Sequence, residues 1–298
     1  MSDKTDLEAD YVRFTTAAAL RELFARWASE AAAYREAARS RVELDVPYGA
    51  APRQRLDIFR AESAVVGAAG AAGAPGAAGE PVALFIHGGY FQMGDKATYS
   101  HVARGGNARG LTVAVASYTL CPEATLSAIV DEIRQAVVFL ARRFGAQVTV
   151  YGHSAGGHLA ACMLATDFRA VDPALGEHVV PAALPVSGLF ELEPLVATSL
   201  NKALRLDASE ARRLSPLFWT PPVGKALKAY VGGAETPEFL RQSRMLAARW
   251  HAEGVQAAAV EIEGAGHFEA LEALADPESA VSRDLEALAR GVRDGKVG

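Results

Sequence analysis

The chain has 298 residues, of which 50% are hydrophobic and 22% are charged, and its formal net charge is −5 at pH 7. This apolar content excludes general disorder, and the near balance of 30 basic and 35 acidic residues excludes the strongly positive surface of a typical nucleic-acid-binding protein. The two cysteines, Cys121 and Cys162, are too few for a disulfide framework and cannot alone form a four-ligand zinc site.

The first ten residues, MSDKTDLEAD, are acidic and polar, the reverse of the basic and apolar regions of an export signal. No uninterrupted apolar run approaches the roughly 18 residues of a membrane-spanning helix. We therefore expect a cytoplasmic protein with neither a membrane nor a nucleic acid as partner. No sequence feature specifies the oligomeric state, and a homodimer stays open.

The first predicted elements are a helix and a pair of strands. Apolar residues recur at steps of three and four over 17–38, which predicts an amphipathic helix packed on the domain. Residues 42–49 and 54–59 are predicted to form two strands joined by a short turn. The Gly/Ala-rich segment 67–79 is predicted as a flexible surface loop inside the domain.

From residue 81 onward, predicted strands alternate with predicted helices. The strand segments are continuous apolar runs, typical of buried parallel strands, and the alternation predicts one α/β domain. Its mostly parallel sheet of about eight strands should carry helices on both faces. The segment 190–223 breaks the alternation and is predicted as a small cap. The predicted strands cover 81–88, 111–118, 147–152, 179–188, 225–233 and 255–264, and the predicted helices cover 124–144, 155–166, 236–253 and 277–293.

The sequence GHSAG at 152–156 lies where a predicted strand meets a predicted helix. Its G-x-S-x-G pattern is that of a nucleophile elbow, in which small flanking residues let the serine hydroxyl stand exposed above a sheet. The N terminus of the following helix directs N–H groups and the positive end of its dipole to the same place. The pattern predicts Ser154 as a nucleophile, and a plain glycine-rich turn is the alternative.

A second glycine motif, His87-Gly88-Gly89-Tyr90, follows the strand 81–88. Glycines at such a position let backbone N–H groups turn toward a developing oxyanion without interference from a Cβ atom. We predict that the amides of Gly88, Gly89 and Ala155 form an oxyanion hole. A glycine turn at a strand end is the alternative.

A serine nucleophile needs a histidine base, and seven histidines are available. His267 is best placed, because it lies in a glycine-containing loop directly after the strand 255–264. The other six are interpreted as packing residues (His153, His158), a brace for the glycine loop (His87) and surface residues (His101, His178, His251).

The carboxylate that orients the base should follow the strand 225–233. Glu235 fits this position, while Glu238 falls inside the helix after Pro237, where a glutamate in the first turn is ordinary dipole complementation. We therefore favour Glu235 over Glu238. The resulting chain order of serine, acid and histidine is that of the α/β-hydrolases.

With these residues in place, the chain resembles the α/β-hydrolases, in the branch that contains kynurenine formamidases and related small carboxylesterases. The resemblance extends over nearly the whole chain from about residue 40. It is carried by HGGYFQMGDKATYS (87–100), YTLCPE (118–123), GHSAGGHLA (152–160), SGLFELEPL (187–195), TSLNKALRLD (198–207) and VGGAETPEFLRQS (231–243).

The resemblance implies Ser154 as nucleophile, His267 as base and Glu235 as acid. Two positions depart from the pattern of the formamidases. Phe91 stands where these enzymes often have tryptophan, which affects the contact with an aryl substrate, and Glu235 stands where aspartate is common. The longer glutamate side chain requires a slightly different geometry at His267.

These observations predict a serine hydrolase that cleaves a formamide, amide or ester bond of a small molecule through an acyl-enzyme. An arylformamidase acting on N-formylkynurenine or similar anilides is favoured, with a short-acyl carboxylesterase as the alternative and a non-catalytic binding protein as the third hypothesis. Neither a metal nor another cofactor is expected. The predicted walls of the substrate pocket are Tyr90, Phe91, Tyr118 and Phe190, and core packing is an equal alternative for the last two.

Overall fold

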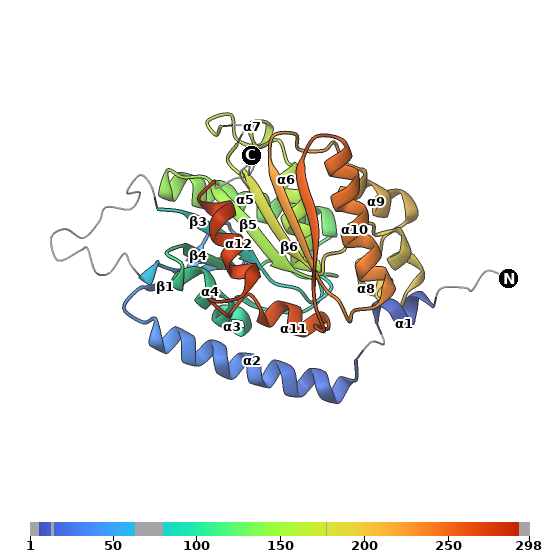
Figure 1. Cartoon of the computed structure of the whole chain (residues 1–298), viewed down its shortest axis with the longest axis horizontal. Helices are drawn as coiled ribbons and strands as arrows, with labels where there is room; N and C mark the ends of the chain where they lie inside the picture. Colours follow the sequence, from blue (N-terminus) through green and yellow to red (C-terminus); the bar gives the residue numbers. More distant parts are fainter. Residues whose placement is uncertain (1–5, 13–14, 63–79, 177, 292–298) are drawn as a thin grey trace.

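A computed structural model describes residues 6–12, 15–62, 80–176 and 178–291. In this part of the chain, eight strands form one sheet in the order β1-β2-β4-β3-β5-β6-β7-β8 (Figure 1). The two pairs β1–β2 and β2–β4 are antiparallel, and all other neighbours are parallel. The strands are β1 (Val42–Pro47), β2 (Arg55–Phe59), β3 (Val82–Ile86), β4 (Thr112–Ala116), β5 (Val148–His153), β6 (Ala182–Val186), β7 (Ala226–Gly232) and β8 (Gln256–Ile262).

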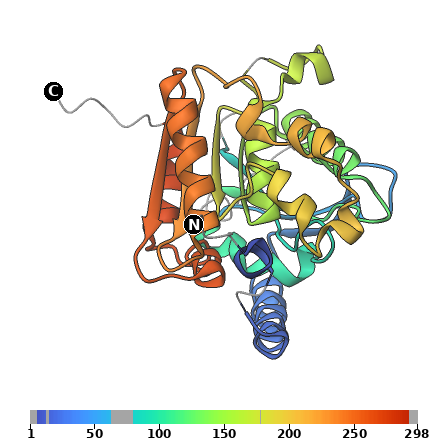
Figure 2. The same ribbon diagram turned by 90° about the vertical axis from the view of Figure 1, so that its right-hand side faces the viewer.

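Helices cover both faces of this sheet, so the predicted α/β-hydrolase architecture is confirmed (Figure 1). Helix α2 lies along one edge of the domain, close to α11, in both views (Figures 1 and 2). The helices are α1 (Leu7–Tyr11), α2 (Ala17–Ala37), α3 (Lys96–Tyr99), η2 (Ser100–Val102), α4 (Ala103–Ala108), α5 (Leu126–Phe144), α6 (Ala155–Ala165), α7 (Phe168–Val171), η3 (Glu193–Ala197), α8 (Asn201–Leu204), α9 (Ala208–Arg213), η4 (Pro216–Phe218), α10 (Pro237–Ala252), α11 (His267–Glu272) and α12 (Ala280–Ala289).

The central strands are buried on both sides because each face of the sheet has its own hydrophobic core. Successive side chains of a strand point to opposite faces. In β3, Leu84 therefore packs in the cluster with α5 and α6, while Phe85 packs in the cluster with α2, α4 and α12. Strands β3, β4 and β5 are consequently buried along their whole length and mostly apolar, which is why they were predictable.

The elements absent from the sequence prediction are short. Helices α3 and α4 have 4 and 6 residues, and α4 includes two glycines that disfavour a helix. The segment 190–223 forms η3, α8, α9 and η4, and its action as a cap stays a prediction. The predicted loop at 67–79 lies outside the described residues.

The parallel strands β5 to β8 all end at the same edge of the sheet. Ser154 follows β5, Ser187 follows β6, Glu235 follows β7, and His267 follows β8. In open α/β sheets, ligands bind outside the carboxyl ends of the strands. This edge is therefore where the chemistry of the protein is expected.

Candidate active site

Ser154 occupies a sharp turn between β5 and α6. Its backbone has φ 56° and ψ −120°, a conformation that costs a residue with a side chain about 1–3 kcal/mol. The turn is held because the Ser154 N–H donates to the carbonyl of Val186 at 2.8 Å and the Ser154 carbonyl accepts from the His158 N–H at 3.1 Å. This strained strand-to-helix geometry is that of a nucleophile elbow.

The two glycines of GHSAG are required by close backbone contacts. A Cβ atom on Gly156 would lie 1.9 Å from the carbonyl oxygen of Ile86, and one on Gly152 would lie 2.4 Å from the carbonyl oxygen of Gly156. Only glycine therefore lets α6 pack this closely against β3 and β5. The structure thus supports the elbow over a plain glycine turn.

Glu235 and His267 form a buried hydrogen-bonded pair. The Nδ1–H of His267 donates to Oε2 of Glu235 at 2.6 Å, and the two residues are only 7% and 9% exposed. The ring of Phe239 packs 4.5 Å from that of His267, measured between centroids. His267 is the first residue of α11, capped by Gly266, and so begins a helix instead of lying in the expected loop.

The second oxygen of Glu235 is held by two donors that the sequence did not reveal. Oε1 accepts from the Ser187 hydroxyl at 2.5 Å and from the Gly232 N–H at 2.7 Å. Ser187 is buried, and its φ of 52° is a strained value for a residue other than glycine. The two donors fix the carboxylate so that Oε2 faces His267.

We expect that Ser187→Ala lowers kcat about tenfold and leaves KM nearly unchanged, because a hydrogen bond to a charged group contributes roughly 1.5–3 kcal/mol. Ser187→Gly should show the same loss although it relieves the positive φ, which separates the hydroxyl from the backbone strain. Ser243→Ala is the matched control, since the buried Ser243 hydroxyl has no hydrogen-bond partner in the described part of the chain. Steady-state kinetics on the purified variants measure both constants, and full activity of Ser187→Gly would contradict this expectation.

His153 does more than pack in the elbow. Its Nε2–H donates to the carbonyl of His267 at 2.7 Å, and the two rings lie 4.5 Å apart. Burial lowers the pKa of His153 well below its usual value, and the nearby His267 lowers it further, so the ring is neutral. The residue before the elbow serine therefore ties the elbow to the start of α11.

Glu238 lies in the first turn of α10, as expected, and has other partners. It accepts from the Tyr11 hydroxyl at 2.5 Å and from Arg241 at 2.7 and 2.8 Å. Burial alone would raise the pKa of Glu238, but the hydrogen bonds from Arg241 and Tyr11 lower it below its usual value. Of the two glutamates, the structure places Glu235 against His267.

The glycine loop after β3 adjoins Ser154. A Cβ atom on Gly88 would lie 3.0 Å from the Cβ of Ser154, and Gly89, with φ 107°, lines the cavity beside the serine. Ala155 is the first residue of α6, where helix N–H groups have no acceptor within the helix. The three predicted oxyanion residues are thus brought together around Ser154.

His87 braces this loop, as predicted. Its Nδ1 is 2.7 Å from the carbonyl oxygen of Gly88, and its ring stacks on those of Tyr118 and Tyr99, with centroids 4.4 and 5.5 Å away. Burial lowers the pKa of His87 to about 4. The buried, neutral ring therefore supports the loop through these contacts.

A cavity of about 190 Å³ lies beside the predicted nucleophile and base. Ser154 and His267 both line it, together with His153 and Tyr90. Much of its remaining wall is apolar and comes from the N-terminal part of the chain, from the glycine loop and from α11. These lining residues are Val12, Thr15, Leu20, Phe24, Trp27, Gly89, Met93, Tyr99, Leu200 and Phe268.

The predicted pocket walls need correction. Tyr90 lines the cavity, but Phe91, Tyr118 and Phe190 are not among the described residues that do so. All three are at most 1% exposed. Phe91 packs against the ring of His158 at 5.4 Å, and the Tyr118 hydroxyl donates to the carbonyl of His87 at 3.0 Å.

The remaining histidines are placed as expected with one exception. His158 is buried in α6 and contacts the carbonyl oxygen of Leu189 at 2.7 Å through Nδ1, which confirms a packing role. His178 and His251 are exposed. His101, predicted on the surface, is instead buried with its ring 6.1 Å from that of Trp27, because α2 covers η2.

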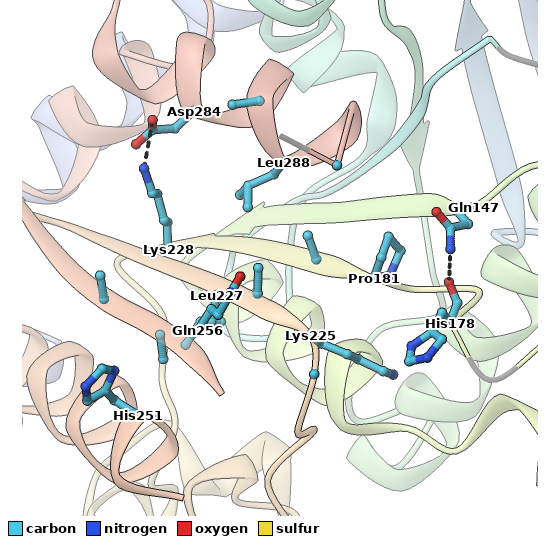
Figure 3. A pocket seen from close by; sticks show the side chains of 17 residues that line it. Gln147, His178, Pro181, Lys225, Leu227, Lys228, His251, Gln256, Asp284 and Leu288 are labelled. Atoms are coloured by element: carbon cyan, nitrogen blue, oxygen red, sulfur yellow. Dashed lines mark hydrogen bonds and ion pairs between the residues drawn. The ribbon is translucent and has the colours of Figure 1, made fainter. Parts of the chain in front are cut away.

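A larger cavity of about 490 Å³ lies at the opposite edge of the sheet, at the amino ends of β6, β7 and β8 (Figure 3). Its charged side chains are paired with other groups of the protein: Lys228 with Asp284 at 3.0 Å, and Lys225 with the carbonyl of Leu164 at 2.9 Å. Neither Ser154 nor His267 lines this cavity. The smaller cavity is therefore the candidate active site.

Three further observations concern the described residues as a whole. They include no group of three or more His, Cys, Asp or Glu side chains placed to hold a metal ion. Both cysteines, Cys121 and Cys162, are buried and free. None of the helices in the described ranges combines the length and the apolar character needed to cross a bilayer.

The fold and the site define a class of protein. An elbow serine, a glycine loop beside it and a carboxylate–histidine pair meet at the carboxyl edge of a mostly parallel sheet, which is the arrangement of a serine hydrolase. Residues 83–270 match the family with the alpha/beta hydrolase fold. The chain belongs to this family, and it is a hydrolase.

Similar proteins include enzymes that cleave formamides. The kynurenine formamidase of Drosophila melanogaster is 30% identical over 248 residues, covering 78% of this chain and 77% of that one. The kynurenine formamidase of Danio rerio is 27% identical over 240 residues, with the same shares covered. A solved structure of a candidate thioesterase from Silicibacter sp. TM1040 superposes with a TM-score of 0.78 at 34% identity, covering 93% of this chain and 97% of that one.

Proposed function

We propose that the protein hydrolyses aryl formamides, with Ser154 as nucleophile, His267 as base and Glu235 as the orienting acid. The observation that carries the proposal is the 2.6 Å hydrogen bond from His267 to Glu235, because His267 lines the same cavity as the elbow serine. The aromatic side chains of this cavity suit an aryl group, and the named formamidases among the relatives support a formamide bond.

The proposed mechanism gives each of these residues its role in serine hydrolysis. With Nδ1–H of His267 committed to Glu235, Nε2 takes the Ser154 proton as Oγ attacks the formyl carbon. The amides of Gly88, Gly89 and Ala155 stabilise the oxyanion. The imidazolium then protonates the leaving arylamine, the C–N bond breaks, and a water activated by His267 releases formate from the formyl-serine.

A carboxylesterase is the second candidate, because the same residues cleave esters by the same steps. The two functions differ only in how the acyl group and the leaving group are bound. Solved structures with the same fold include an esterase from Pyrobaculum calidifontis, with a TM-score of 0.65 at 20% identity over 91% of this chain and 93% of that one. The third hypothesis, a non-catalytic binding protein, conflicts with a complete set of serine, histidine and acid.

Kinetic comparison of N-formylkynurenine and formanilide with p-nitrophenyl acetate and butyrate tests the proposal. We expect kcat/KM for at least one formamide to equal or exceed that for the esters, although esters are intrinsically the more reactive. Preference for the esters by several orders of magnitude would overturn the formamide assignment and leave the esterase.

Two further expectations stay proposals. We propose a cytoplasmic location, which accords with the two free cysteines and is tested by fractionation of cells. A homodimer is tested by analytical ultracentrifugation.

A further inference from the structure

The N-terminal helix α2 contributes one wall of the catalytic cavity. Leu20, Phe24 and Trp27 line the cavity, and their spacing of four and three residues places them on one face of the helix. Trp27 is 1% exposed, whereas Leu20 and Phe24 are half-buried. Side chains more than 120 positions before Ser154 in the sequence thus face the site where the reaction occurs.

Aromatic rings from three segments meet at this wall. The Trp27 ring lies 5.6 Å from that of Phe24, 5.5 Å from that of Tyr99 and 5.9 Å from that of Phe268. All four residues line the cavity, and Phe268 directly follows His267 in α11. Such rings bind another ring edge-to-face or offset, at centroid distances of about 4.5–7 Å.

Two residues of α2 bind helix α11, which begins with His267. Trp27 donates through its indole N–H to Glu272 at 3.4 Å, and Arg26 also donates to this carboxylate. Glu272 is the last residue of α11, the helix that begins with His267. Helix α2 is therefore held by the same short helix that supplies the base, so the ring positions and the base position are linked.

We propose that Phe24 and Trp27 of α2 form the binding site for the aromatic ring of the substrate and restrict it to a single ring. A cavity of about 150 Å³ holds one benzene molecule, so about 190 Å³ accommodates one ring with a small acyl group. This inference deepens the proposed function, on which it rests for the serine chemistry, and names its substrate class: small acyl derivatives of single-ring amines or alcohols.

The test uses acetates that share an acyl group and differ in the leaving alcohol. Phe24→Ala should lower kcat/KM for phenyl acetate at least about tenfold, within the range that one missing apolar contact produces in a binding pocket. Ethyl acetate, which has no ring, should be affected less than about twofold, and 1-naphthyl acetate should improve relative to phenyl acetate because the pocket is enlarged. Leu23→Ala is the matched control, since the partly buried Leu23 packs from the same helix against the hydrophobic core without lining the cavity.

The outcomes separate this inference from the proposed function. Equal losses of kcat/KM for phenyl and ethyl acetate in Phe24→Ala would show that Phe24 supports the fold. No loss of kcat/KM for phenyl acetate would show that the ring binds elsewhere. Either result would contradict the proposed ring-binding site on α2. Failure of the wild type on formanilide with full activity on phenyl acetate would overturn only the formamide assignment. Inhibition by phenylboronic acid and by methylboronic acid compares a ligand that has an aromatic ring with one that has none, without turnover. Equal inhibition of the wild type by the two acids would also contradict the proposed ring-binding site.

Discussion

Replacing Ser154 by alanine should abolish hydrolysis, with kcat reduced by at least about 10⁴-fold, because removing the nucleophile of a serine triad removes the covalent route altogether. The backbone turn should persist, since Gly152 and Gly156 make the close contacts that allow it. A fluorophosphonate probe should label the wild type and leave Ser154→Ala unlabelled, as read by intact-protein mass spectrometry.

Ser243→Ala serves as the control for the probe, because Ser243 is a buried serine outside the candidate site. It should label as the wild type does. Labelling of Ser154→Ala at the wild-type rate would show that another residue is the nucleophile, which would contradict the proposed mechanism.

Glu235→Gln should reduce kcat by roughly 10³–10⁴-fold, the loss expected when a triad acid becomes an amide. The amide cannot stabilise the imidazolium that forms on His267, and its NH₂ group can favour the wrong tautomer of the ring. KM should change little, because Glu235 does not line the cavity in the described part of the structure. Stopped-flow or steady-state assays with a chromogenic ester measure both constants.

Glu238→Gln is the matched control, three residues further along the same segment. Its carboxylate accepts hydrogen bonds from Tyr11 and Arg241, so its loss should weaken the docking of α1 on α10. We expect a fall in Tm of a few degrees, at roughly 2–4 °C per kcal/mol for a domain of this size, with a fall in kcat below about tenfold. A larger loss of kcat in Glu238→Gln than in Glu235→Gln would reverse the assignment of the acid.

The sheet and the meeting of Ser154, Glu235 and His267 at one edge of it could be predicted because their signals are local. Small residues must surround an elbow serine, and a base and an acid must follow strand ends, so short stretches around Ser154, Glu235 and His267 carry the information. The signals of the buried strands are equally local, since each strand is a short, mostly apolar segment. The two helices at 96–108 were missed because short helices depend on tertiary contacts more than on their own propensity.

The surroundings of the three residues could not be predicted because they depend on contacts between distant positions. His153 and His267 are 114 residues apart, and Ser187 and Glu235 are 48 apart. The predicted pocket walls include the neighbours Tyr90 and Phe91, which both have positive φ. Tyr90 lines the cavity, whereas Phe91 packs in the hydrophobic core. The apolar face of α2 was predicted, but its contact with the catalytic edge was not.

The aromatic wall of α2 lies outside residues 83–270, the region that matches the family. Exchange of the segment before the sheet would therefore replace the surface that selects the leaving group, whereas Ser154, Glu235 and His267 all lie inside the matched region. In such a chain, the specificity for the leaving group can change in evolution while the type of reaction stays the same. Directed evolution toward bulkier leaving groups should accordingly begin with saturation of positions 20 and 24, where half-buried side chains tolerate change better than the fully enclosed Trp27.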